Sequence, residues 1–111
     1  MTGALCTVSS HVLDAVAGRP AADVAITLSR RNDEGFFTTV HADRTDEDGR
    51  VTGWQTAPGL HRLRFDTGEW FAAKGVEAFY PEVEIAFRAD TGHYHVPLLL
   101  SPFAYSTYRG S

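Results

Sequence analysis

Short segments in which apolar and polar residues alternate recur along the whole chain, and clusters of turn-forming residues separate them. A period of two that is repeated at short intervals is typical of a β-sandwich or a barrel built from short strands. The segments follow one another through all 111 residues without a linker, a low-complexity stretch or an internal repeat. The sequence therefore predicts a single domain that covers residues 1–111.

The alternation predicts eight strands and one helix. The strands are expected at Ala4–Val12, at Val24–Arg30, at Phe36–Ala42, from Arg50 onward, at Leu60–Asp66, at Val83–Phe87, at His93–Leu100 and at Ala104–Arg109. A short helix is expected at Glu69–Lys74, where Asp66 or Thr67 can cap the start and Gly75 can adopt the left-handed conformation at the end. The predicted fold class is all-β, a two-sheet, eight-stranded sandwich with one short helix.

Composition argues against several classes of protein. The net charge of -4 provides no basic surface for nucleic acid. A single cysteine, Cys6, cannot form an internal disulfide or a cysteine-based zinc cluster. The sequence lacks the run of about 18 apolar residues that a membrane span needs, and its N-terminus lacks the features of a signal peptide. We therefore expect a cytoplasmic protein with neither nucleic acid nor membrane as a partner.

Alternation also sorts the histidines by face. His11 lies on the face of the first expected strand opposite Val8 and Val12, and His95 lies on the face of the seventh opposite Leu98. Both imidazoles are therefore expected to point away from the core. If they meet on one outer face, they can perform general acid–base catalysis, because imidazole exchanges protons near neutral pH.

Other interpretations of these residues stay open. His93 and His95 share a face, a spacing that suits a metal pair, but no carboxylate is placed to complete the site, so no metal is predicted. Pro97 cannot donate to a strand ladder, so it indicates an edge strand or a bulge. Surface histidines without a role are the ordinary alternative at four positions, His11, His41, His61 and His93.

Three segments resemble the transthyretin-like superfamily. They are residues 10–21, SHVLDAVAGRPA, residues 79–83, FYPEV, and residues 93–111, HYHVPLLLSPFAYSTYRGS. The last segment resembles one branch in particular, the 5-hydroxyisourate hydrolases, and the Tyr-Arg-Gly-Ser ending is its most specific signal. The resemblance covers essentially the whole chain.

The resemblance implies a transthyretin-like (prealbumin-like) sandwich that assembles as a homotetramer, a dimer of dimers formed through edge strands. It implies hydrolysis of 5-hydroxyisourate to 2-oxo-4-hydroxy-4-carboxy-5-ureidoimidazoline in urate degradation, part of purine metabolism. Substrate sites are expected in clefts between the dimers, and neither a metal nor an organic cofactor is expected.

The family's functional residues match five positions of this sequence. The resemblance implies catalytic roles for His11, Arg50 and His95, and substrate binding by His11, Arg50, Tyr108 and Ser111. In the hormone carriers of the superfamily these positions are replaced. Which histidine is the general base stays open. The alternative functions are a small-molecule carrier without catalysis and a structural β-sandwich.

Overall fold

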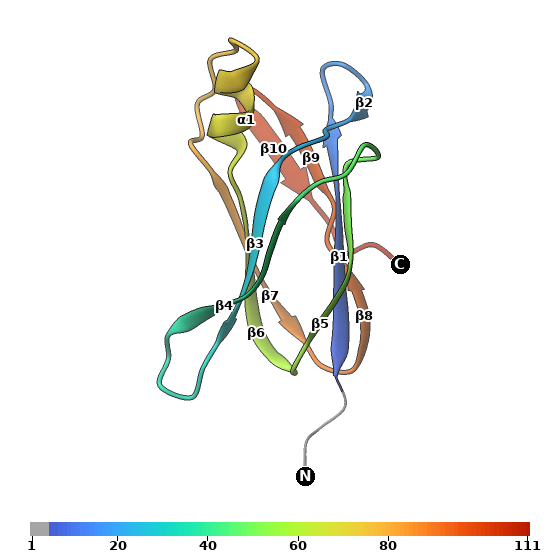
Figure 1. Ribbon diagram of the computed structural model, residues 1–111, viewed down its shortest axis with the longest axis vertical. Helices are drawn as coiled ribbons and strands as arrows, with labels where there is room; N and C mark the ends of the chain where they lie inside the picture. Colours follow the sequence, from blue (N-terminus) through green and yellow to red (C-terminus); the bar gives the residue numbers. More distant parts are fainter. Residues whose placement is uncertain (1–4) are drawn as a thin grey trace.

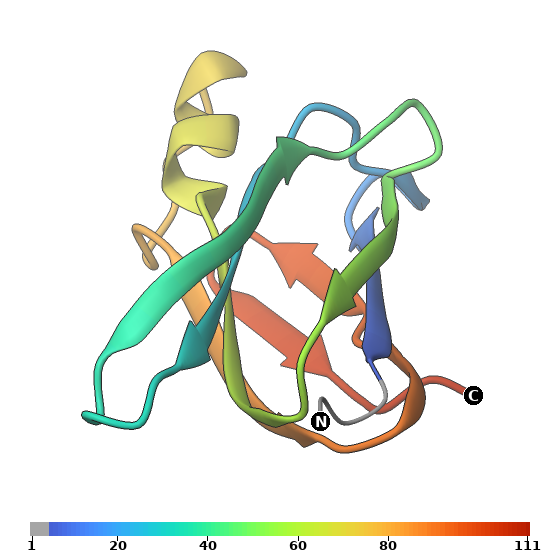
Figure 2. The ribbon, with the colours of Figure 1, turned by 60° about the horizontal axis from the view of Figure 1, so that its bottom comes forward.

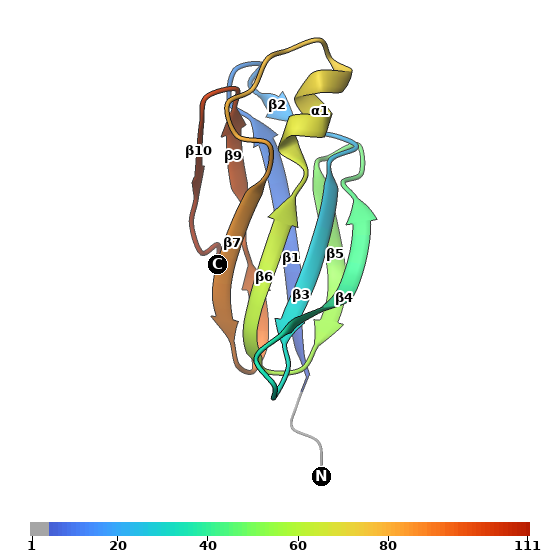
Figure 3. The same cartoon turned by 90° about the vertical axis from the view of Figure 1, so that its left-hand side faces the viewer.

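A computed structural model describes residues 5–111 as an elongated β-sandwich with principal extents of 49 × 27 × 20 Å (Figure 1). The expected start of the first strand at Ala4 lies outside the described residues. One helix lies at one end of the sandwich, and the two sheets pack face to face along its length (Figure 2 and Figure 3). No helix within residues 5–111 has the length and hydropathy to cross a membrane.

The described residues form ten strand segments and one helix. In chain order these are β1 (Cys6–Asp14), β2 (Arg19–Pro20), β3 (Ala25–Arg31), β4 (Phe37–Arg44), β5 (Arg50–Thr56), β6 (Gly59–Phe65), α1 (Thr67–Ala73), β7 (Val83–Ala89), β8 (Gly92–His95), β9 (Leu98–Ser101) and β10 (Ala104–Thr107). The predicted all-β sandwich with one short helix is confirmed.

Strand β1 is the centre of the sheet that concerns function. Strands β5 and β2 pair antiparallel along one side of β1, while β8 and β9 pair parallel along its other side. Strand β10 then pairs antiparallel with β9 at the edge. The second sheet has the order β4-β3-β6-β7. Edge strands β10 and β7 lie on the same side of the sandwich (Figure 3).

The strand count differs from the expected eight for two reasons. The seventh expected strand divides into β8 and β9 at Val96 and Pro97, where proline cannot donate to the ladder. The chain also makes a two-residue strand, β2, after the turn that follows β1. The last strand ends at Thr107 and not at Arg109, and this changes the position expected for the residues after it.

The inward faces of both sheets form the core, as alternation predicts. Val8, Val12 and Leu98 from the first sheet pack with residues of the second, such as Phe65 and Leu63, and all five have an exposed fraction of 0%. Burying a side chain of this size stabilises the fold by about 1.5–3 kcal/mol. Because one face of β1 is committed to the core, the alternate residues of β1 face outward.

The helix begins two residues before the expected Glu69 and ends at Ala73. Asp66 occupies the N-cap position, but within the described chain its side chain makes no capping hydrogen bond, and its Oδ1 atom lies 3.3 Å from Arg64 Nε. Gly75 adopts φ 70 at the other end, as predicted. Trp70 and Phe71 bury the inner face of the helix and close one end of the core.

Candidate active site

The outer face of the β1 sheet brings His11 and Arg50 together. The two residues are direct partners in the antiparallel pairing of β1 with β5. Directly opposed residues in such a pair have Cβ atoms about 5 Å apart and point to the same side of the sheet. His11 is half-buried and Arg50 is exposed. The pair therefore presents an imidazole and a guanidinium side by side to the same outer surface.

A β-bulge in β5 is the reason that Arg50 faces outward. Val8 pairs with Trp54 and Ser10 pairs with Val51, so β5 carries one residue more than β1 between these pairs. Gly53 takes φ 73 within the bulge, a conformation that glycine adopts without strain. Because of the extra residue, Trp54 and Val51 both face the core although they are three positions apart, and the next residue, Arg50, faces outward.

The acidic turn before β5 fixes where Arg50 begins the strand. The Asp46 Oδ1 atom accepts hydrogen bonds from the backbone N–H groups of Asp48 and Arg50, each at 2.9 Å. Gly49 adopts φ 76, and a Cβ atom there would lie 2.5 Å from the carbonyl oxygen of Val12. The backbone N–H of Val12 donates to the Gly49 carbonyl at 2.8 Å, which ties the turn to β1.

His95 joins this face from the other side of β1. In the parallel pairing of β1 with β8, Thr7 is the partner of His93 and Ser9 is the partner of His95. The Nδ1 atom of His95 lies 2.7 Å from Ser9 Oγ in a hydrogen bond. The backbone N–H of Val96 donates to the Ser9 carbonyl at 3.0 Å, so the backbone on the C-terminal side of His95 is also tied to β1.

The surroundings of His95 favour its neutral form. Burial lowers the pKa of His95 below its ordinary value, and the positive charges of Arg50, His93 and His11 lower it further. The strand pairings place these groups, since β5 with Arg50 and β8 with His93 and His95 flank β1, which carries His11. A neutral imidazole with a lone pair available near neutral pH can act as a general base.

The C-terminal tail crosses over His95. The backbone N–H of Gly110 donates to the His95 carbonyl at 2.8 Å and forms an antiparallel bridge with it. A Cβ atom on Gly110 would lie 2.5 Å from His95 Cδ2, so only glycine lets the tail lie this close to the ring. The tail therefore contacts one side of the imidazole and limits its rotation.

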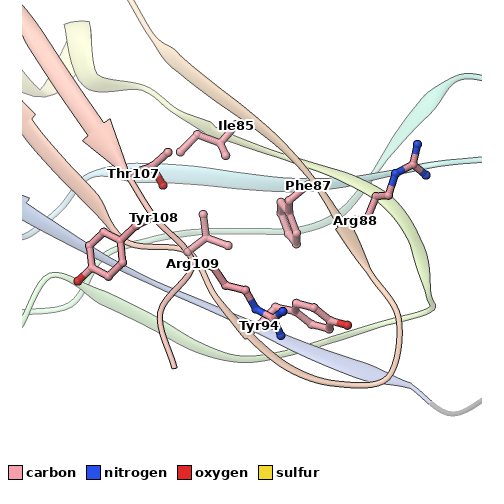
Figure 4. A pocket seen from close by; sticks show the side chains of 8 residues that line it. Ile85, Phe87, Arg88, Tyr94, Thr107, Tyr108 and Arg109 are labelled. Carbon is pink, nitrogen blue, oxygen red and sulfur yellow. The ribbon is translucent and has the colours of Figure 1, made fainter.

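Tyr108 and Ser111 lie elsewhere on the tail. Tyr108 follows the end of β10, so strand alternation does not govern its direction, and it borders a cavity of about 220 Å³ between β7 and the tail. Figure 4 shows the Tyr108 ring pointing away from Phe87, while Arg109 reaches the Tyr94 ring at 4.7 Å from its centroid. Ser111 is exposed. Neither Tyr108 nor Ser111 makes a hydrogen bond to His11, Arg50 or His95 in the described chain.

This cavity is not lined by the three predicted catalytic residues. The cavity is lined by Ile85 and Phe87 of β7, by Val96 between β8 and β9, and by residues at the end of β10 and in the tail. His11, Arg50 and His95 lie on the open outer face of the sheet instead. The polar face carries the imidazoles that can exchange protons near neutral pH, whereas the cavity lining contains no histidine. A single chain presents one wall of a site, not an enclosed pocket.

The expectation that His61 is a surface histidine is wrong. Its exposed fraction is 0%, its Nε2 atom lies 2.8 Å from Thr56 Oγ1, and its Nδ1 atom lies 3.0 Å from the Gly59 carbonyl oxygen. Burial holds the pKa of His61 below its ordinary value. The sequence did carry a signal, since His61 shares a strand face with Leu63 and Phe65, both of which are fully buried.

Ser9 is a contact residue of the site that neither alternation nor the family resemblance singled out. Its hydroxyl lies within hydrogen-bonding distance of two imidazoles, 2.7 Å from His95 Nδ1 and 3.1 Å from His93 Nε2. The parallel register of β1 and β8 creates this contact, and register between distant strands is not visible in the sequence. Within residues 5–111, no three His, Cys, Asp or Glu side chains are arranged to hold a metal ion.

Comparison with known proteins gives relatives that share most of this chain. The 5-hydroxyisourate hydrolase of Salmonella typhimurium is 43% identical over 109 residues, which cover 93% of this chain and 79% of the relative. The 5-hydroxyisourate hydrolase of Mus musculus is 41% identical over 110 residues, which cover 93% of each chain.

Solved structures with the same fold include both a hydrolase and a carrier. The 5-hydroxyisourate hydrolase of Klebsiella pneumoniae superposes with a TM-score of 0.84 at 37% identity, covering 96% of this chain and 94% of its own. Sea bream transthyretin in complex with thyroxine superposes with a TM-score of 0.88 at 33% identity, covering 93% of each. The backbone alone therefore does not separate the two functions. The model of the HIUase/Transthyretin family matches residues 8–110, and the chain belongs to this family.

Proposed function

We propose that this protein hydrolyses 5-hydroxyisourate to 2-oxo-4-hydroxy-4-carboxy-5-ureidoimidazoline in urate degradation. The observation that carries the proposal is the polar outer face of the β1 sheet, where His11 pairs with Arg50 across β1 and β5, and the half-buried His95 pairs with Ser9 on the other side of β1. Relatives that are named 5-hydroxyisourate hydrolases support it at 41–43% identity. A carrier of small molecules has no need of a titratable pair beside an arginine.

Arg50 binds the substrate in this proposal. Its guanidinium is a planar group of N–H donors that matches a carbonyl or an anionic edge of the flat substrate ring. The same group stabilises the negative charge that develops on the carbonyl oxygen when water attacks. Because the acidic turn and the Gly53 bulge fix the backbone of Arg50, its side chain starts from a defined position on the face.

His95 is the general base and His11 the general acid of the proposed reaction. The Nε2 atom of neutral His95 takes a proton from water, and the hydroxide that forms bonds to the ring carbonyl carbon. The C–N bond then breaks, and His11 gives a proton to the leaving nitrogen. The new carboxyl group ionises, so one net proton leaves the site in each turnover. Acid–base catalysis of this kind contributes about 10²–10⁴-fold to a rate.

Tyr108 and Ser111 complete the substrate site through hydrogen bonds to the ring. Both side chains are exposed on a single chain, and the tail that carries them already contacts His95 through Gly110. A second chain that covers the outer face brings the tail and the histidines into one cleft. We propose that this cleft lies between the two dimers of a homotetramer.

The edges of the sandwich support such an assembly. Within residues 5–111, β7 and β10 each have one side without a strand partner, and they lie on the same side of the molecule (Figure 3). Unpaired edges of this kind are where strands of a second chain add. Dimers formed there leave the outer face of the β1 sheet free to meet a second dimer. We propose a cytoplasmic location for the tetramer.

The activity is tested by following the ultraviolet absorbance of freshly prepared 5-hydroxyisourate, which decays slowly without a catalyst. The protein should accelerate this decay, and His95→Ala should lower kcat about a hundredfold or more, since the base is lost. His41→Gln is the matched control, because His41 lies on β4 and bonds a backbone carbonyl outside the site. It should keep the wild-type rate.

Unchanged decay in the presence of the wild-type protein would favour the carrier instead. Sea bream transthyretin binds thyroxine in the same fold. Near-full activity of His95→Ala, with the decay still accelerated, would leave the reaction in place but remove the base assigned to it.

A further inference from the structure

We propose that Ser9, His93 and Thr7 form a proton relay that connects the imidazole of His95 to solvent. The inference rests on the proposed role of His95 as general base. It assigns roles to three residues that the reaction scheme above does not use. None of the three needs to touch the substrate, so they act through His95.

Four side chains form an unbroken chain of hydrogen bonds along the seam between β1 and β8. Thr7 Oγ1 lies 2.7 Å from His93 Nδ1, and His93 Nε2 lies 3.1 Å from Ser9 Oγ. Ser9 Oγ then lies 2.7 Å from His95 Nδ1. All three distances are within the range of good hydrogen bonds. The parallel register, with Thr7 opposite His93 and Ser9 opposite His95, places the four groups in a row.

The chain runs from a covered end to an open end. Ser9 is 5% exposed, and His95 is half-buried beneath the tail. His93 is exposed, and its bond to Thr7 lies at the surface. A proton that reaches His93 can therefore pass to water, whereas a proton held on His95 in a covered site cannot.

The donors and acceptors of the chain fit two complete arrangements. In the first, His95 Nδ1–H donates to Ser9, the Ser9 hydroxyl donates to His93 Nε2, and His93 Nδ1–H donates to Thr7. In the second, every hydrogen bond is reversed, so that Thr7 donates to His93, His93 to Ser9, and Ser9 to His95. A hydroxyl suits the middle position because it can both donate and accept.

Passage between the two arrangements moves one proton. When His95 Nε2 accepts a proton from water, His95 Nδ1–H passes to Ser9, the Ser9 proton passes to His93 Nε2, and the proton on His93 Nδ1 leaves through Thr7 to solvent. His95 ends neutral, with its hydrogen on Nε2. After the product leaves, the Nε2 proton passes to water and the chain takes one proton back at Thr7, which restores the first arrangement without a net change. The relay and the new carboxyl group together release two protons and His11 takes one back from solvent, so each ring opening releases one proton.

The charges around His95 create a need for such a path. Arg50, His11 and His93 face it from β5, β1 and β8, and among the described residues its hydrogen bonds are to a hydroxyl and backbone groups, not to a carboxylate. In sites where a carboxylate supports the histidine, the imidazolium can persist through the reaction. Here the neighbours disfavour imidazolium, so its proton must leave quickly.

Two variants interrupt the relay at different places. Ser9→Ala removes the middle hydroxyl, and His93→Ala removes the surface imidazole. Each should lower kcat roughly tenfold with little change in KM, because proton transfer is slowed while Arg50 still binds the ring. Ser10→Ala is the matched control, since the Ser10 hydroxyl donates to the Val96 carbonyl at 2.7 Å and contacts no imidazole. It should keep the wild-type kcat.

Rescue separates a relay from a packing role. Millimolar imidazole added to His93→Ala should restore most of kcat, because the missing group sat at the surface where a free base can replace it. The same addition should leave Ser9→Ala and the wild type unchanged. A loss in His93→Ala that imidazole does not restore would overturn the relay.

A measurement without substrate keeps the proposal testable if a variant is hard to assay. In ¹⁵N NMR spectra of the ring nitrogens, Ser9→Ala should change the proportion of the two neutral tautomers of His95, and Ser10→Ala should not. If Ser9→Ala and His93→Ala both keep the wild-type rate and tautomer proportions while His95→Ala is inactive, the relay is overturned but the proposed role of His95 is not. An inactive wild type would overturn the proposed reaction instead.

Discussion

Two histidines of this protein make nearly the same contact with a hydroxyl group, yet we assign them different roles, one structural and one in the proposed reaction. His61 lies 2.8 Å from Thr56 Oγ1 inside the sandwich, and His95 lies 2.7 Å from Ser9 Oγ on the outer face of the β1 sheet. Burial lowers the pKa of both imidazoles. Neither the residue pair nor the direction of the pKa shift therefore distinguishes a structural histidine from a reactive one.

The second ring nitrogen makes the difference. His61 uses both nitrogens, the other one bonding the Gly59 carbonyl, and its ring stacks on Phe87 with centroids 5.6 Å apart. The Nε2 atom of His95 has no hydrogen-bond partner within residues 5–111, and it belongs to a half-buried ring. A histidine can react when one nitrogen is held by the protein and the other is left for water or substrate.

Removing the buried imidazole should have the largest effect on stability. His61→Ala leaves a cavity beside Phe87 and two polar groups without partners, so the free energy of unfolding should fall by about 2–4 kcal/mol. Urea unfolding measures the loss, and the activity per folded molecule should stay close to wild type. His95→Ala should show the reverse pattern. A His61→Ala protein that is stable but inactive would contradict the distinction between the two histidines.

A smaller effect is expected from the tail. In Gly110→Ala the new methyl group would lie 2.5 Å from His95 Cδ2, so the ring must move away from the position that Ser9 holds. We expect kcat to fall about tenfold, equivalent to roughly 1.4 kcal/mol in the activation barrier. Ser106→Ala, an exposed change on β10, is the control and should have no effect. Equal kcat values for both variants would show that the tail does not position the imidazole.

The smallest effect is expected from pH. Because burial depresses the pKa of His61 in the folded state, the unfolded chain takes up a proton first as the pH falls below about 6.5. The stabilisation is therefore complete above that value and is lost progressively below it. Urea unfolding between pH 7.5 and 5 should show a shallower decline for His61→Gln than for the wild type. Equal declines in the free energy of unfolding for the two proteins would mean that other titratable groups determine the pH dependence.

Much of the fold could be predicted from the sequence, since alternation reflects which side chains are buried. It correctly assigned the core faces of β1 and β9, the turn glycine at Gly75, and the outward direction of His11. It failed for His61 because the residue type suggested the surface, although the neighbours Leu63 and Phe65 on the same face are buried. A polar residue that shares a strand face with apolar residues is a candidate for burial with hydrogen-bond partners.

The arrangement of the candidate site was less accessible to sequence reasoning. The contact of Ser9 with two imidazoles depends on the register of strands more than 80 positions apart. The direction of Tyr108 depends on β10 ending at Thr107, where the tail turns to cross His95. Such features arise from pairing between distant segments, and a pattern within one segment does not contain them.

The bulge at Gly53 shows that the number of residues in β5 decides which of its side chains face outward. Side chains of a strand alternate between its two faces. One added residue therefore moves all side chains on one side of the insertion to the opposite face. The bulge at Gly53 has this effect: Trp54 and Val51 both face the core, and Arg50 faces outward. The Arg50 guanidinium thus reaches the outer face of the candidate site because one residue is inserted in β5, and not because of any other residue on that face.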